Sequence, residues 1–264
     1  MSIHPTAIVA AGAQVPASCT VGPYCTIGPD AVLGEDCELI SHVVLEGHIT
    51  LGSGNRISPF ACLGVAPQDL KYAGEPTRVR IGDNNSIREY VTISRGTTGG
   101  GGLTTVGSNC LIMCSGHVGH DSHVGDHCIL ANAATLAGHV TVEDYAVVGA
   151  FSAVHQFCRV GKYAYIGGGT MATQDVLPYS LTSIERNNHA YSINKVGLER
   201  KGFTPTQIKQ LRAAYRLLQS SKLNTADALA AIRESIASMA GSPEAEHVAY
   251  LVDFIASSHR GVIK

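Results

Sequence analysis

The feature that most constrains this sequence is an aliphatic residue that returns at every sixth position. From residue 106 onward the period is unbroken, and its members are Val106, Ile112, Val118, Val124, Leu130, Leu136, Val142, Val148, Val154, Val160 and Ile166. A six-residue period fits neither a helix nor the two-residue alternation of an amphipathic strand. It is typical of a hexapeptide β-helix, in which each hexad supplies a short strand and a turn. We therefore expect an all-β solenoid whose triangular coils contain three hexads each.

The same period covers most of the preceding sequence. Ile3 to Leu63 gives eleven hexads and Ile81 to Ile93 gives three, so that the chain holds 25 hexads in all. They would form about eight coils and, at the usual strand spacing, a prism on the order of 40 Å long. The period does not reveal the hand of the coil, and parallel crossovers are ordinarily right-handed.

Two segments interrupt the period and are expected to leave the prism as loops. The first, near residues 65–79, is polar and contains two prolines. The second, near residues 94–105, reads SRGTTGGGGLTT. Its four glycines lack the strand–glycine–helix context of a nucleotide-binding loop, so we interpret this segment as a flexible loop. Such excursions from a regular scaffold often carry function.

Helical signals replace the period after Ala172. Thr204, Pro205 and Gln207 predict a capped helix start, and the apolar residues that follow have helical spacing. Two further helices are expected, over Thr225 to Ala240 and from Pro243 towards Ser257. We divide the chain into a β-helix over residues 1–193 and an α-helical domain over residues 194–264, which can cap the open end of the solenoid.

Composition agrees with this architecture and restricts the location of the protein. The 264 residues include 29 glycines and no tryptophan, which suits a solenoid with many tight turns. No apolar window of roughly twenty residues exists, so we expect no membrane span. The N-terminus lacks a basic start and an apolar core, so we expect no signal peptide and a cytoplasmic location.

Most cysteines follow the repeat. Six of the eight take the fifth position of the hexad, where alanine or valine stands elsewhere: Cys19, Cys25, Cys37, Cys110, Cys128 and Cys158. This position is expected to be a small slot that faces the interior, where cysteine behaves as a buried hydrophobe. We therefore interpret these cysteines as core residues, without a redox or metal-binding role.

Residues eighteen apart should stack on neighbouring coils, about 4.8 Å from each other. His120, Gly138 and Gln156 then share one column, and His139 and His155 lie one residue to either side of it. We interpret this edge of the prism as the active site.

His120 is the candidate general base, because neutral histidine is the usual base near pH 7. Gly138 stacks on it and offers a backbone N–H that no side chain covers, which suits an oxyanion donor. Asp121 could orient the His120 ring if the turn brings its carboxylate round. No serine or cysteine stands in a nucleophile setting, which favours direct transfer to an acceptor hydroxyl.

His117, His120 and His123 form an HxxHxxH motif that could suggest zinc. They alternate between hexad positions rather than converging, so we expect no metal. A site between subunits, as in hexapeptide carbonic anhydrases, is the alternative, and elemental analysis would decide between the two.

A local excess of positive charge points to an acidic partner. Seven basic residues and one acid between Lys195 and Leu223 give a local charge of +6, against −2 for the whole chain. The patch is either a solvated helix face or a docking surface for an acidic protein or a phosphate-bearing ligand. Nucleic acid is not expected, because interleaved aromatic residues are missing.

The chain contains the segments QDLKYAGEPTRV, GHVGHD, LAGHV, VHQF and GLERKGF. With these, it resembles the UDP-N-acetylglucosamine O-acyltransferase family of lipid A biosynthesis over essentially its whole length. The resemblance implies a homotrimer of left-handed β-helices with active sites between subunits. It implies transfer of an (R)-3-hydroxyacyl group from acyl carrier protein to the 3-hydroxyl of UDP-N-acetylglucosamine, the first step of lipid A biosynthesis. No cofactor is expected.

Site residues follow from the same resemblance. His120 matches the general base and Gly138 the oxyanion donor of the family. Substrate-binding roles are implied for Gln68, Asp69, Lys71, His117, His139, His155, Gln156, Gly168, Asn194 and Arg200. Among these, Asn194 and Arg200 match nucleotide contacts, and Gly168 matches the position that limits acyl length, where a glycine suggests room for a longer chain.

The sequence departs from the family in the nucleotide region. Val196 replaces a glutamate found in some members, and Lys201 replaces an arginine, which keeps the charge but loses the bidentate fork. The stretch SIERNNHAY before Asn194 differs in length, so its residues are left unassigned.

Other functions fit parts of this pattern. The N-acyltransferase of the same pathway carries an extra domain before its repeat, whereas the repeat here starts at Ile3. An acetyl-CoA-dependent acetyltransferase and a non-catalytic β-helix scaffold fit the fold alone. The sequence leaves open the acyl length and whether the acceptor is a 3-hydroxyl or a 3-amino sugar.

Overall fold

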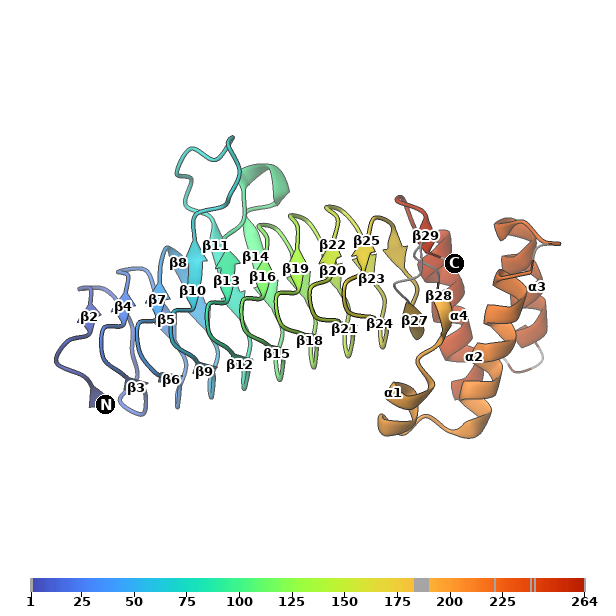
Figure 1. The fold of residues 1–264 in the computed structure, drawn as a ribbon, viewed down its shortest axis with the longest axis horizontal. Coiled ribbons are helices and arrows are strands. Elements are labelled where there is room, and N and C mark those ends of the chain that lie inside the picture. Colours follow the sequence, from blue (N-terminus) through green and yellow to red (C-terminus); the bar gives the residue numbers. More distant parts are fainter. Residues whose placement is uncertain (1, 183–189, 221, 238, 240, 264) are drawn as a thin grey trace.

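The computed structural model describes residues 2–182, 190–220, 222–237, 239 and 241–263. Short strands are stacked along a straight prism, and the helices gather at its C-terminal end (Figure 1). Among the described residues the strands form three sheets, which we call the first, second and third sheets in the order in which a coil visits them.

The first sheet contains β1 (Ser2–Ile3), β3 (Thr20–Val21), β6 (Glu38–Leu39), β9 (Arg56–Ile57), β12 (Ser86–Ile87), β15 (Leu111–Ile112), β18 (Ile129–Leu130), β21 (Val147–Val148), β24 (Tyr165–Ile166), β27 (Ser180–Thr182) and β28 (Ala190–Ile193). The second contains β2 (Ile8–Val9), β4 (Thr26–Ile27), β7 (Val44–Leu45), β10 (Cys62–Val65), β13 (Thr92–Ser94), β16 (His117–Val118), β19 (Thr135–Leu136), β22 (Ala153–Val154) and β25 (Met171–Ala172). The third contains β5 (Val32–Leu33), β8 (His48–Leu51), β11 (Arg78–Ile81), β14 (Leu103–Val106), β17 (His123–Val124), β20 (Thr141–Val142), β23 (Arg159–Val160), β26 (Asp175–Val176) and β29 (Val262–Ile263).

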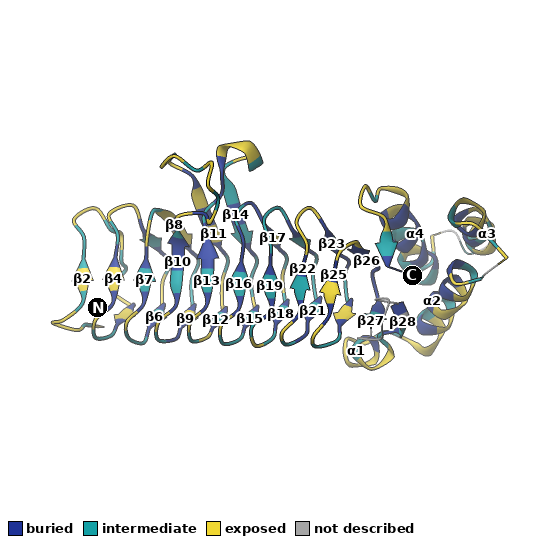
Figure 2. Ribbon diagram, turned by 45° about the horizontal axis from the view of Figure 1, so that its top comes forward, coloured by how far each residue is buried: buried dark blue, intermediate teal, exposed yellow. Residues whose placement is uncertain are grey.

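The register confirms the eighteen-residue coil. His117 pairs in parallel with Thr135, which pairs with Ala153, which pairs with Met171. Because side chains alternate along a strand, the aliphatic residue of each hexad points inward and its neighbour points out, as the burial pattern shows (Figure 2). The solenoid is a left-handed parallel β-helix, as the resemblance implied.

The six cysteines of the fifth hexad position are buried and free, as expected for a small inward slot. The fourth position of many hexads has a left-handed backbone, including Asp121 (φ 57°) and His139 (φ 60°). This conformation turns the chain sharply from one sheet to the next.

Both excursions replace a turn between the second and third sheets, and they project side by side from one edge of the prism (Figure 1). The first spans residues 66–77. The second is shorter than expected and spans residues 95–102, with a 3₁₀ turn, η1 (Thr98–Gly100). Residues 103–105 were expected in the loop but belong to β14, because β14 pairs along all four residues of β11.

The C-terminal part contains α1 (Lys195–Arg200), α2 (Pro205–Leu218), α3 (Thr225–Ala237) and α4 (Pro243–Ala256). Thr204 and Gln207 form the expected capping box of α2. Helix α1 was not expected, and α3 ends before the anticipated Ala240, which lies outside the described residues. No helix in the described part of the chain is long and apolar enough to span a bilayer.

This part of the chain is not purely helical. β28 runs antiparallel to β27, and β29 returns to pair in parallel with β26. The two strands occupy the open edges of the first and third sheets, which would otherwise present unpaired backbone groups. A division at residues 193 and 194, where β28 ends, stays our proposal for the domain boundary.

The helices pack around a core of their own, centred on Leu198, Leu211, Ile232 and Leu251. Arg159 joins this core to the solenoid. Its guanidinium pairs with the buried Asp175 (3.2 Å), donates to the Phe254 carbonyl (2.9 Å) and lies 4.2 Å from the centre of the Phe254 ring.

Candidate active site

The candidate site lies on the edge between the second and third sheets, which we call the histidine edge. Its turns at residues 119–122, 137–140 and 155–158 stack in order, because the His139 N–H donates to the His120 carbonyl (2.9 Å) and the Phe157 N–H to the Gly138 carbonyl (3.4 Å). His120, Gly138 and Gln156 therefore share one column, as predicted. The two excursions emerge from the same edge.

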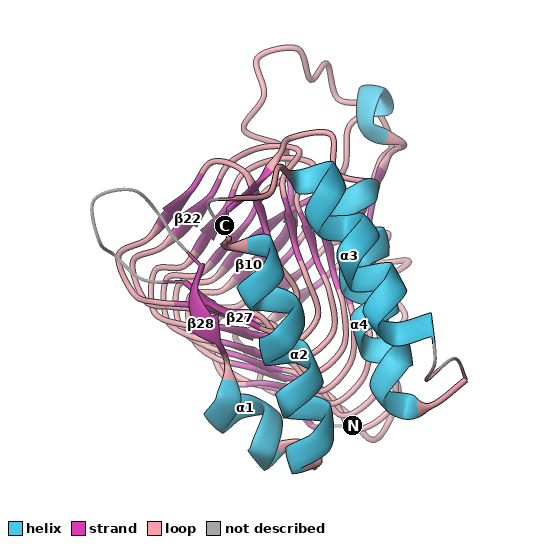
Figure 3. Ribbon diagram, turned by 90° about the vertical axis from the view of Figure 1, so that its right-hand side faces the viewer, coloured by secondary structure: helices cyan, strands magenta, loops and turns pink. Residues whose placement is uncertain are grey.

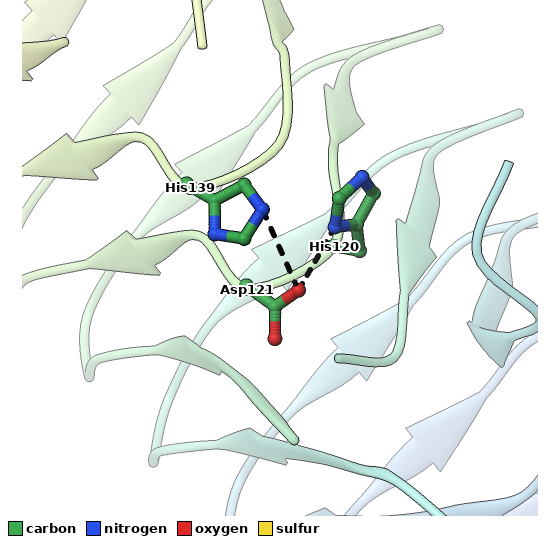
Figure 4. A group of neighbouring side chains, drawn as sticks. All are labelled: His120, Asp121 and His139. Atoms are coloured by element: carbon green, nitrogen blue, oxygen red, sulfur yellow. Dashed lines mark hydrogen bonds and ion pairs between the residues drawn. The ribbon is translucent and has the colours of Figure 1, made fainter. Parts of the chain in front are cut away.

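The turn brings the Asp121 carboxylate to His120, as the sequence analysis required. His120 Nδ1 lies 2.9 Å from Asp121 Oδ2 (Figure 4). The Asp121 side chain is fully buried, whereas the His120 side chain is 18% exposed and can reach a ligand. The left-handed backbone of Asp121 directs its carboxylate back towards the ring of the preceding residue.

Asp121 is held as a carboxylate. Burial acts to raise its pKa, but hydrogen bonds from Thr97 and His120 outweigh burial and keep the pKa below its ordinary value. An ionised carboxylate can only accept, so it fixes the proton of neutral His120 on Nδ1. The other ring nitrogen, Nε2, is then free to accept a proton.

Gly138 packs directly against this ring. A methyl group at Gly138 would lie 2.6 Å from both Nε2 and Cε1 of His120, so any larger residue would displace the ring. Within the described residues, the Gly138 N–H donates to no protein acceptor. The free nitrogen of His120 thus lies beside a free backbone donor, the arrangement expected of a base and an oxyanion donor.

His139 and His117 surround the pair. The His139 ring meets the His120 ring edge to face at 5.0 Å and stacks on Phe157 at 4.5 Å. His117 Nδ1 lies 2.7 Å from the Thr92 hydroxyl. Burial lowers the pKa of both His139 and His117, and the proximity of His120 lowers it further. Their neutral rings add no positive charge beside the base.

His155 and Gln156 are exposed one coil beyond Gly138. His155 Nδ1 lies 3.1 Å from the Arg260 guanidinium, which the sequence analysis did not anticipate. These two side chains border the histidine edge without contacting His120.

The first excursion carries Gln68, Asp69 and Lys71. Asp69 accepts the Lys71 backbone N–H (3.0 Å), and its charge acts on His139, so this part of the loop faces the site. Gln68 and Lys71 are exposed, and no ion pair of Lys71 is found in the described part of the chain. Arg95 fixes the loop by donating to the Tyr72 hydroxyl (2.8 Å) and the Gly64 carbonyl (2.7 Å).

Three predicted site residues lie on other edges of the same chain. Asn194 caps α1 by accepting from the Gly197 N–H (3.1 Å), and it donates to the carbonyl of Tyr163, in a turn between the third and first sheets. Arg200 is exposed at the end of α1. Viewed along the prism, α1 lies on the side opposite the excursions (Figure 3). Gly168 lies in a turn between the first and second sheets.

The basic segment forms a groove of about 390 Å³ between α1 and α2. It is lined by Lys195, Lys209, Arg212 and Arg216, with Glu199 as the acidic member. Glu199 pairs with Lys195 (3.4 Å), whereas the other three cations form no ion pair within the described residues. The groove therefore presents uncompensated positive charge.

A metal centre fits the histidine edge poorly. The ligand atoms of His120, Asp121 and His139 lie within 4.8 Å of one another. However, both Asp121 oxygens already accept hydrogen bonds from Thr97, and Oδ2 also faces His120. His123, the third member of the HxxHxxH motif, lies on the third sheet and contacts Thr105. The cluster suits a base and its orienting carboxylate.

Sequence reasoning missed Thr97 and Thr104. The Asp121 N–H donates to the Thr104 hydroxyl (2.8 Å), and Thr97 bonds the carboxylate. Both belong to the segment interpreted as a flexible loop. The run of glycines was the available signal, because glycine in such a position often marks close approach of a backbone to another group.

Comparisons with known proteins agree with the resemblance. A family model described as UDP N-acetylglucosamine O-acyltransferase, domain 2, matches residues 175–263. The acyl-[acyl-carrier-protein]–UDP-N-acetylglucosamine O-acyltransferase of Myxococcus xanthus is 47% identical over 262 residues, which cover 99% of each chain. The Francisella novicida UDP-N-acetylglucosamine acyltransferase structure is 40% identical, with a TM-score of 0.92 over 99% of this chain and 93% of that one. The Moraxella catarrhalis UDP-N-acetylglucosamine O-acyltransferase structure is 38% identical, with a TM-score of 0.92 over the whole of both chains.

Proposed function

The chain belongs to the family of acyl-[acyl-carrier-protein]–UDP-N-acetylglucosamine O-acyltransferases, and on this premise we propose the reaction and the residues that perform it. The protein is an acyltransferase of lipid A biosynthesis. The reaction transfers an (R)-3-hydroxyacyl group from the thioester of acyl carrier protein to the 3-hydroxyl of UDP-N-acetylglucosamine. The observation that carries the assignment of residues is the pair of the partly exposed His120 and the buried Asp121, packed against Gly138 and its free N–H.

The mechanism follows from the proton positions. His120 Nε2 removes the proton of the sugar hydroxyl while the hydroxyl oxygen attacks the thioester carbonyl, and Asp121 stabilises the imidazolium that forms. The Gly138 N–H donates to the oxyanion of the tetrahedral intermediate. The intermediate collapses by breaking the carbon–sulfur bond, and the departing thiolate takes the proton from His120. No group on the protein is acylated.

A homotrimer would complete the site. His120 lies on the histidine edge, whereas Asn194 and Arg200 lie near the edge between the third and first sheets. One nucleotide sugar can contact both sets only if they come from different subunits. Exposed aromatic side chains on the edge between the first and second sheets support this assembly, because Tyr24, Tyr90 and Phe151 are 59%, 58% and 74% exposed in a single chain.

Acyl carrier protein is proposed to dock at the basic groove between α1 and α2. Its acidic surface complements Lys209, Arg212 and Arg216, which lack acidic partners in the described residues. A cytoplasmic location is part of the proposal, since all eight cysteines are free thiols, as is usual in a reducing compartment.

Mass spectrometry of the products tests the reaction. Purified protein is incubated with UDP-N-acetylglucosamine, with its 3-amino analogue and with a panel of 3-hydroxyacyl carrier proteins. We expect transfer to the 3-hydroxyl sugar, and a long acyl chain is favoured by Gly168. Transfer to the amino sugar alone would contradict the proposed acceptor.

The His120→Ala variant tests the base. Turnover is expected to fall by roughly 10²- to 10⁴-fold, the range for a lost acid–base group. Light scattering should give the same particle mass as the parent protein. His123→Ala is the matched control, because His123 is exposed, lies on the third sheet and bonds Thr105. Near-normal turnover of His120→Ala would contradict the assignment of His120 as the general base.

A further inference from the structure

The second excursion, residues 95–102, lies against the Asp121 carboxylate, and the reaction above gives it no role. The Thr97 N–H lies 2.9 Å from Asp121 Oδ1 and 3.0 Å from Oδ2. The Thr97 hydroxyl donates to Oδ2 at 2.7 Å. Thr97 is buried, although the residue that follows it is exposed.

The glycines of the excursion allow this approach. A methyl group at Gly96 would lie 2.7 Å from Asp121 Oδ1, and one at Gly100 would overlap the carboxyl group itself. A methyl group at Gly99, by contrast, would meet no atom within 4 Å. At Gly96 a methyl group would also overlap the backbone of residues 102–103. Gly100 is thus the glycine that the carboxylate itself requires, whereas Gly99 is not under that constraint.

The excursion is folded around Thr97. The N–H groups of Gly100 and Gly102 both donate to the Thr97 carbonyl, at 3.0 Å and 2.8 Å. Just beyond the excursion, in β14, the Thr104 hydroxyl accepts the Asp121 N–H. The excursion therefore bonds the side chain of Asp121, and the strand that follows it bonds the backbone.

We propose that Thr97 is a positioning residue of the acyl transfer, which aims the Asp121 carboxylate at His120. The Thr97 hydroxyl and His120 Nδ1 share one oxygen, Oδ2, so the hydroxyl fixes both the direction and the charge of the group that orients the base. The inference rests on the proposed function, since it assigns a role through His120.

Thr97→Val removes the hydroxyl and keeps the shape of the side chain. We expect kcat to fall about tenfold, the effect of one hydrogen bond to a charged group, with KM for both substrates within about twofold of the parent value. Within the described part of the chain, two titratable groups face Asp121, His120 at 2.9 Å and His139 at 4.0 Å. A carboxylate with one donor fewer attracts the imidazolium proton more strongly, so the acid limb of the kcat/KM profile should move to higher pH.

Thr97→Ser should restore both kcat and the pH profile, because it returns the hydroxyl. Thr98→Val is the matched control, since Thr98 is the exposed neighbour in the same turn and makes no bond to Asp121 in the described structure. A second matched pair tests the backbone approach. Gly100→Ala should lower kcat at least as much as Thr97→Val, and Gly99→Ala should leave it unchanged.

Parent-like kcat and pH profile in Thr97→Val would overturn the proposal. So would a lower kcat that Thr97→Ser fails to restore, or one that leaves the acid limb in place, because either result indicates loop packing only. The His120→Ala variant separates this failure from that of the proposed function. If His120→Ala is active, the function assigned to His120 fails; if it is inactive while Thr97→Val is fully active, only the role of Thr97 fails.

Discussion

Replacing Gly138 with alanine tests the central contact of the site. The added methyl group would lie 2.6 Å from Cε1 and Nε2 of His120 and 3.1 Å from Nδ1. Carbon atoms in proteins approach to roughly 3.5–4.0 Å, so the ring must retreat by about 1 Å. Gly138 does not have a left-handed backbone, so alanine adds no strain of its own there.

The expected cost of Gly138→Ala is a fall in kcat of about 10²-fold. A displacement of about 1 Å in a catalytic group has an effect of this size, and the His120–Asp121 bond would lengthen as well. The assay is steady-state turnover with acyl carrier protein thioester and UDP-N-acetylglucosamine, together with the melting temperature. The melting temperature should change little, because the partly exposed ring can move towards solvent.

Gly99→Ala is the control, since it adds the same methyl group where no atom lies within 4 Å. Turnover of Gly138→Ala within about twofold of the parent value would refute the reasoning. It would mean that the close packing of His120 on Gly138 is not needed for catalysis.

Three further predictions concern the loop, the groove and the junction of the two cores. Lys71→Ala should lower kcat/KM and leave the melting temperature nearly unchanged, because Lys71 is exposed at a loop tip; unfolding would instead make the loop a structural clasp. Replacing Arg212 and Arg216 with glutamate should raise KM for acyl carrier protein more than KM for the sugar nucleotide, and it should weaken the salt dependence of KM for acyl carrier protein. Arg233→Glu on α3 is the control and should change neither quantity. Unchanged values in the double variant would mean that the groove is a solvated face. Arg159→Met should destabilise the fold by about 3 kcal/mol in thermal unfolding, because Asp175 is left buried without its cation. Adding Asp175→Asn should recover part of this loss. An unchanged stability of Arg159→Met would mean that the Arg159–Asp175 pair does not join the two cores.

The hexad period predicts the solenoid, and it also predicts where the two excursions lie relative to the site. Leu63, Ile93 and Val118 each lie in a strand of the second sheet, so the segments that follow these strands leave from one edge. Counting hexads therefore places both excursions beside His120 from sequence alone. The column of His120, Gly138 and Gln156 follows from the same count.

The hexad period could not predict the structure of the segments that interrupt it or follow it. The contact of Thr97 with Asp121 depends on the path of an excursion without regular structure, and nothing in its sequence fixes that path. Strands β28 and β29 carry no hexad signal, and they form because the last coil leaves sheet edges to pair. The N-cap of Asn194 required knowledge of α1, a helix too short to give a clear pattern.

The turn at Asp121 has two unfavourable features, a left-handed backbone and a buried carboxylate, and the second excursion lies where it can stabilise both. Non-glycine residues in left-handed conformation cost about 1 kcal/mol each, and several of those in the solenoid have rings that stack on a neighbouring coil, as Tyr145 and Tyr163 do at 4.8 Å. Asp121 takes the same turn position but has no ring to stack. Its carboxylate is also buried, which is unfavourable without donors. The three contacts from Thr97 supply donors to this carboxylate, so the excursion stabilises the turn and leaves a charged group aimed at His120.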